Sequence, residues 1–333
     1  MQKRYRILLP VLIIAAVILS LAALCMGQFS LSVSDVIRIL AGRGKNIVNG
    51  AVVVWNVRVP RILMSLLCGA GLAVSGAAFQ ALFSNPLATA DTLGCANGAS
   101  FGAALGILLG FQSFGVQLSA LLFGMLSVVL VFAVTKTKGN ESRSMMMIIL
   151  GGMVISSLFS SLVSLIKYVA DPNDVLPVIT FWLMGSFSNA TMKSLIQGGG
   201  IIIVGTVILY LLRYRLNILS LSEEEAKSLG LDIRKIRFLV IVSSSMITAS
   251  VVSMCGVIGW VGLLIPHIAR MLFGNNNIRV IPACIVIGAL FMVGVDTVAR
   301  CAVASEIPVS ILTSVIGAPV FLLLLRKTGG VHL

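Results

Sequence analysis

The side chains that most often carry chemistry are few in this chain and lie far apart. It holds two histidines, His267 and His332, and six cysteines that occur singly. Zinc and iron–sulfur sites need several such ligands at short spacings, and no C-x-x-C pair occurs here. The sequence therefore predicts neither a metal site nor a disulfide framework.

Motifs that bind nucleotides or cleave bonds are absent as well. The P-loop pattern G-x-x-x-x-G-K-[ST] does not occur, because Gly44-Lys45 is followed by Asn46. H-E-x-x-H is missing, and Gly185-Ser186 lacks the rest of a nucleophile motif. We therefore predict a non-catalytic chain that has no nucleotide site of its own.

Three arginines form the first group that could bind a partner. Arg58 and Arg61 precede one apolar run, and Arg300 follows another. A guanidinium binds a carboxylate through two parallel hydrogen bonds, so these residues are suited to bind carboxylates. The alternative is that they reach lipid headgroups from the ends of membrane helices.

The segment 213–237 is the second such group. It mixes six basic residues with Glu223, Glu224, Glu225 and Asp232. Leu221, Ala226 and Leu229 recur at helical spacing, which favours a surface helix docked on a partner over a lipid-binding basic patch.

The elements that position these groups are membrane helices. The chain has 333 residues, of which 58% are hydrophobic and only 11% charged. About 25% charge is usual in soluble domains, so a soluble enzyme, a nucleic-acid binder and a disordered protein are all excluded. The composition predicts an all-α polytopic membrane protein with a single domain over residues 1–333, in contact with membrane lipid.

Uncharged runs of sufficient length predict the spans. They are 7–26, 62–83, 92–110, 115–135, 144–166, 194–212, 280–295 and 307–325. The run 238–269 is too long for one span, and its glycines favour a break near Cys255–Gly256. The stretch 175–192 favours a short helix that does not cross. These assignments give about ten spans.

The distribution of basic residues supports this topology. With both termini in the cytoplasm, most of the 24 Lys and Arg residues fall on the cytoplasmic side. Treating 238–269 as one span almost abolishes the bias, and a crossing by 175–192 reverses it. The segment 27–61 then lies outside as an amphipathic element, and 213–237 lies inside.

Acidic residues are almost absent from the apolar runs. Asp296 falls near the outer end of one run, and Asp91 falls just before another. Carriers coupled to ions or protons usually place ionisable groups at mid-membrane, so this scarcity favours an external energy source.

Four stretches resemble the FecCD-type permeases of ABC importers for iron-siderophores, haem and cobalamin. They are Arg58-Val59-Pro60-Arg61; Asn85-Pro86-Leu87-Ala88; Glu225-Ala226 through Pro266-His267-Ile268-Ala269-Arg270; and Asp296 through Ile316-Gly317-Ala318-Pro319. Their order and spacing over residues 58–327 make the resemblance specific. It implies a type II ABC importer permease fold in a bacterial or archaeal cytoplasmic membrane.

The resemblance also implies partners. It implies a homodimer, two cytoplasmic ABC ATPase subunits that use ATP and Mg²⁺, and an extracytoplasmic substrate-binding protein. The cargo it implies is an iron chelate, with cobalamin or haem as alternatives. A self-sufficient secondary carrier or channel is the rival hypothesis.

Residue roles follow from the matched positions. Arg58, Arg61 and Arg300 would dock the binding protein. Coupling to the ATPase would involve Leu221, Glu223, Glu224, Glu225, Ala226, Leu229 and Gly230. A cytoplasmic gate would involve Asn85, Leu87, Ser142 and Ser144, although Asn85 and Pro86 could equally form an ordinary turn.

Overall fold

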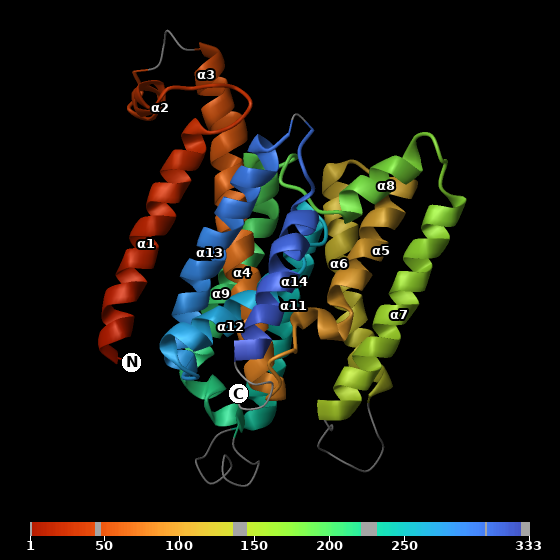
Figure 1. Ribbon diagram of the computed structural model, residues 1–333. Coiled ribbons are helices and arrows are strands. Elements are labelled where there is room, and N and C mark those ends of the chain that lie inside the picture. Colours follow the sequence, from red (N-terminus) through yellow and green to blue (C-terminus); the bar gives the residue numbers. More distant parts are fainter. Residues whose placement is uncertain (1, 44–47, 136–144, 221–231, 304, 328–333) are drawn as a thin grey trace.

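The computed structural model describes residues 2–43, 48–135, 145–220, 232–303 and 305–327, and these residues form helices without strands (Figure 1). In chain order the helices are α1 (Gln2–Cys25), α2 (Val33–Leu40), α3 (Val48–Val52), η1 (Val53–Arg58), α4 (Val59–Phe83), η2 (Ala90–Leu93), α5 (Cys95–Leu108), α6 (Ser113–Val134), α7 (Met145–Val169), α8 (Val175–Leu183), α9 (Met192–Leu216), η3 (Ile218–Ser220), α11 (Ile233–Cys255), α12 (Val261–Phe273), α13 (Asn277–Cys301) and α14 (Val309–Lys327). The all-α membrane fold predicted from composition is confirmed.

Length and apolarity single out the helices that can cross a membrane. Among the described residues seven are long enough, and α5, α12 and α14 are shorter apolar helices. The share of buried residues in the most apolar window separates core from periphery: it is 83% in the span containing α4 and 78% in α11, but 11% in α1. The core therefore lies around α4 and α11, and α1 runs along the outside of the bundle (Figure 1).

Glycine lets α4 approach its neighbours. A Cβ on Gly69 would lie 2.2 Å from the Gly288 carbonyl oxygen on α13. A Cβ on Gly76 would lie 1.9 Å from the Gly262 carbonyl oxygen on α12. Small residues at such crossings bring two helix backbones into contact, which is a common packing mode inside membranes.

The break predicted near Cys255–Gly256 is present. Helix α11 ends at Cys255, Gly256 has φ +72°, and α12 starts at Val261 after an unwound segment, residues 256–260. Part of this backbone is paired: the Gly256 N–H donates to the Val252 carbonyl at 2.9 Å, and the Gly259 carbonyl accepts from the Val261 N–H at 2.9 Å. Unwound backbone is tolerated within a membrane where protein buries it, as here.

The two ends of the bundle differ in what they carry. Helix α1 begins, α9 ends, α11 begins and α14 ends at the same end, which we call the termini end (Figure 1). Helices α2, α3 and α8 lie at the opposite end. In α2, Val36 and Ile39 are buried while the polar Ser34 and Arg38 are exposed, so this helix of the segment 27–61 is amphipathic.

Candidate functional site

The three predicted docking arginines converge at the end opposite the termini end, but they are buried. Arg61 binds Asp296 through both carboxylate oxygens, with Nη2–Oδ1 at 2.8 Å and Nε–Oδ2 at 3.1 Å. Its Nη1 also lies 2.7 Å from Glu306 Oε1. The side chains of Arg61 and Asp296 are 4% and 1% exposed, whereas that of Glu306 is 33% exposed.

Arg58 and Arg300 bind the end of α1. Arg58 Nη1 donates to the Leu24 carbonyl at 2.5 Å, and Arg300 Nη2 donates to the Ala23 carbonyl at 2.5 Å. The last carbonyls of a helix have no partner within it and carry a partial negative charge, so cations stabilise them. We call Arg58, Arg61, Arg300, Asp296 and Glu306 the arginine cluster; it joins α1 to α4 and α13.

This geometry alters the expectation drawn from charge alone. Docking of a partner and contact with lipid headgroups both need accessible side chains, yet Arg58, Arg61 and Arg300 are 3–5% exposed. Burial is possible because Asp296, Glu306 and the α1 carbonyls replace water around the guanidiniums. Glu306 was not predicted as a partner of Arg61, although it lies within the matched stretch from Asp296 to Pro319. Docking by these arginines stays a prediction.

The described part of the predicted gate is a turn at the termini end. Ser84 ends α4 in the left-handed region with φ +47°. The Leu87 N–H donates to Asn85 Oδ1 at 2.9 Å, so Asn85 holds the turn, and Leu87 is 56% exposed. An exposed leucine is available to line a path, whereas Asn85 is occupied by the backbone. Ser142 and Ser144 lie outside the described residues.

The predicted coupling residues Leu221, Glu223, Glu224, Glu225, Ala226, Leu229 and Gly230 lie outside the described residues. Their flanks are described, and both are at the termini end (Figure 1). The Asp232 carboxylate caps α11 by accepting from the Lys235 N–H at 3.2 Å, and this hydrogen bond lowers the pKa of Asp232. Asn217 Oδ1 accepts from the Asn277 N–H at 2.8 Å, which ties the other flank to the start of α13.

Known proteins resemble this chain over nearly its whole length. A model of the FecCD transport family matches residues 12–327. The molybdate import system permease protein MolB of Haemophilus influenzae is 44% identical over 93% of both chains. A protein of Helicobacter pylori named as a probable iron chelatin transport system permease is 34% identical, covering 99% of this chain and 100% of its own.

A solved structure agrees with these relatives. An inward-facing metal-chelate type ABC transporter superposes with a TM-score of 0.88 at 42% identity, covering 96% of this chain and 99% of that one. The fold, the sequence motifs and the membrane helices thus all indicate the same family of proteins. The chain belongs to the FecCD transport family and is a multi-pass inner-membrane permease of an ABC importer.

Proposed function

We propose that the chain forms a homodimeric conduit of about ten spans per subunit, moved by two partner ATPases. The observation that carries this proposal is the family match over residues 12–327, in a chain with no P-loop. In this proposal the termini end lies in the cytoplasm, where segment 213–237 would meet the ATPases. ATP and Mg²⁺ would be bound by those subunits, and this chain would hold no cofactor.

The cargo we propose is a metal compound delivered by a binding protein. The sequence resemblance favours an iron chelate, as does the relative named for iron chelatin. Molybdate is also a candidate. The relative named for molybdate is more similar to this chain than the one named for iron chelatin, at 44% against 34% identity. Haem and cobalamin remain the alternatives that the resemblance implies.

Reconstitution tests the transport proposal. Proteoliposomes holding the chain with its ATPases and binding protein should accumulate cargo only with ATP inside the compartment that the ATPases face. Parallel uptake of ⁵⁵Fe-siderophore and ⁹⁹Mo-molybdate, each competed by haem and cobalamin, identifies the cargo. Gradient-driven uptake by the chain alone would instead establish a secondary carrier or channel.

The arginine cluster suggests how docking proceeds. A carboxylate of the binding protein would take the place of Glu306 on Arg61, since Glu306 is the solvent-exposed partner and Asp296 is enclosed. Glu306 competes with that carboxylate for Arg61, so removing the charge of Glu306 should strengthen docking. We expect Glu306→Gln to tighten the affinity of the binding protein about threefold, a change of about 0.7 kcal/mol, within the range for exposed ion pairs.

Biosensor titration of the binding protein against the nanodisc-embedded importer measures this effect. Asp174→Asn, at an exposed aspartate before α8, is the matched control for loss of one negative charge at the same end. Equal gains in affinity for both variants would show an effect of net charge at this end and not of the Glu306 contact. A weaker complex with Glu306→Gln would refute partner exchange.

A further inference from the structure

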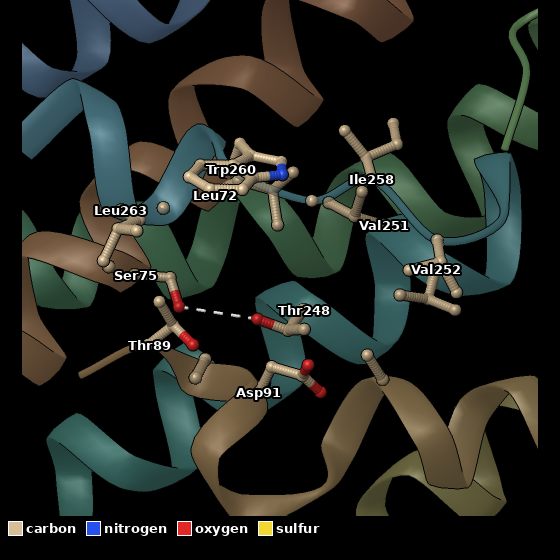
Figure 2. A pocket seen from close by; sticks show the side chains of 16 residues that line it. Leu72, Ser75, Thr89, Asp91, Thr248, Val251, Val252, Ile258, Trp260 and Leu263 are labelled. Carbon is tan, nitrogen blue, oxygen red and sulfur yellow. Dashed lines mark hydrogen bonds between the residues drawn. The ribbon is translucent and has the colours of Figure 1, made fainter. Parts of the chain in front are cut away.

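The hydroxyls at the internal cavity of the bundle already have partners. Figure 2 shows Ser75, Thr89 and Thr248 along the border of this cavity. Ser75 Oγ donates to the Ser244 carbonyl at 3.2 Å and lies 3.5 Å from Thr248 Oγ1. The Thr89 side chain accepts from the Thr92 N–H. These hydroxyls need no further ligand, whereas helix α2 exposes a surface that does need a partner.

Helix α2 exposes a row of apolar side chains at the end of the bundle opposite the termini end. Val33 is 63% exposed, Ile37 60% and Leu40 39%. Residues four and three positions apart lie on one face of a helix, so these side chains form a single row. Contiguous exposed apolar side chains mark a place of contact with another protein or with a membrane.

The other faces of α2 are packed or polar. Val36 and Ile39 are each 3% exposed and pack against the protein. Ser34 and Arg38, four positions apart, are exposed. Around the helix, the apolar row lies between the buried face and the polar face. A helix with these three faces fits a place where protein, lipid and water meet.

The contact of α2 with α1 sets its depth. Val36 and Ile39 belong to one buried cluster with Ala23 and Leu24, in the last turn of α1. The apolar span of α1, Arg4–Cys25, has 22 residues. It is about 33 Å long at 1.5 Å per residue, and the hydrocarbon core of a bilayer is about 30 Å thick. The last turn of α1, and α2 packed on it, therefore lie where hydrocarbon meets the lipid headgroups.

Helix α1 indicates which partner covers the apolar row of α2. The apolar window of α1 is only 11% buried, and Ile14, Ile18 and Leu21 recur at helical spacing with 52–61% exposed. Lipid covers such a face on a membrane span at the outside of a bundle. Met26 and Phe29, in the connection to α2, are nearly half exposed, so apolar surface continues from α1 towards α2. Figure 1 shows α2 at the edge of the molecule beside the end of α1, so the lipid around α1 is the nearest partner for α2.

We propose that α2 is an interfacial anchor whose apolar row inserts into the lipid leaflet opposite the termini end. Amphipathic helices bind at the boundary between headgroups and acyl chains, where they bury their apolar face about 5–10 Å deep. Arg38, on the polar face, is long enough to reach lipid phosphates. The anchor also steadies the arginine cluster, because Arg58 donates to the Phe29 carbonyl in the connection between α1 and α2.

The test uses the full-length chain alone in liposomes, so it stands apart from cargo, ATPases and binding protein. A nitroxide spin label is attached at Ile37→Cys, or at Arg38→Cys as the matched control on the polar face. Both variants carry Cys25→Ser and Cys301→Ser, because the other four cysteines are buried. Oxygen dissolves in hydrocarbon, whereas a neutral nickel chelate stays in water. We expect the ratio of oxygen to nickel collisions to be at least about threefold higher at residue 37 than at residue 38.

Neighbouring positions show whether the whole face is inserted. Labels at Val33→Cys and Leu40→Cys should give the high ratio, and a label at Ser34→Cys should give the low one. A ratio at residue 37 equal to that at residue 38 would show that the row lies in water, open to a soluble partner. Dipolar broadening between labels at residue 37 would show a second copy of the chain on this face. Either result would overturn the proposal.

Discussion

We expect Asp296→Ala to lower the free energy of unfolding by about 3–5 kcal/mol, the cost of breaking a buried ion pair on one side. The carboxylate binds Arg61 through both oxygens and lies 3.9 Å from Arg300 Nε. Its removal leaves two buried guanidiniums without their shared counter-charge. Thermal unfolding of the purified chain in detergent measures the loss.

Glu306→Ala is the internal comparison for this prediction. Glu306 also pairs with Arg61, but a third of its side chain is exposed. Solvent screens that pair, so its removal should cost no more than about 1 kcal/mol. Adding Arg61→Met to Asp296→Ala should recover part of the stability, because one of the two guanidiniums that lost the Asp296 carboxylate is then gone. Equal losses for Asp296→Ala and Glu306→Ala would contradict the buried pairing.

The second large effect concerns the coupling segment. We expect Leu229→Arg to reduce ATP-driven uptake at least about tenfold, and to reduce copurification of the ATPase equally. The resemblance assigns Leu229 to the apolar face that enters the ATPase. An arginine there would have to be buried without a counter-charge, at a cost of several kcal/mol.

The control for Leu229→Arg is the same substitution at the opposite end. Leu109 is 59% exposed in the turn after α5, so Leu109→Arg should leave uptake and ATPase binding unchanged. Thermal unfolding of both variants alone separates a coupling defect from misfolding. Normal ATPase copurification with Leu229→Arg would remove residue 229 from the contact.

Much of the fold could be predicted because lipid leaves the backbone few choices. Backbone groups in hydrocarbon must pair within a helix, so an apolar run locates a helix closely. The run 62–83 became α4 at Val59–Phe83, and the glycines after Cys255 ended α11 where they were expected to. The stretch 175–192 contains the short helix α8.

The candidate site was harder to predict, because its contacts join distant parts of the chain. Arg61 and Asp296 are 235 positions apart, and nothing local in the sequence marks them as a pair. The scarcity of acidic residues in apolar runs placed Asp91 outside the spans. Only the packing of residues 92–94 against α7 shows that the chain returns into the bundle here, because hydropathy locates helices but not the loops that return between them.

The attachment of α1 has a consequence for how the chain is made. Its Ala23 carbonyl accepts from Arg300, which the ribosome adds 277 residues later. Until then α1 is held by few contacts, Arg58 at the Leu24 carbonyl among them, and it can remain in the bilayer because its hydropathy suffices for insertion on its own. Helix α1 therefore gains its contact with Arg300 only after the C-terminal half of the bundle has been synthesised.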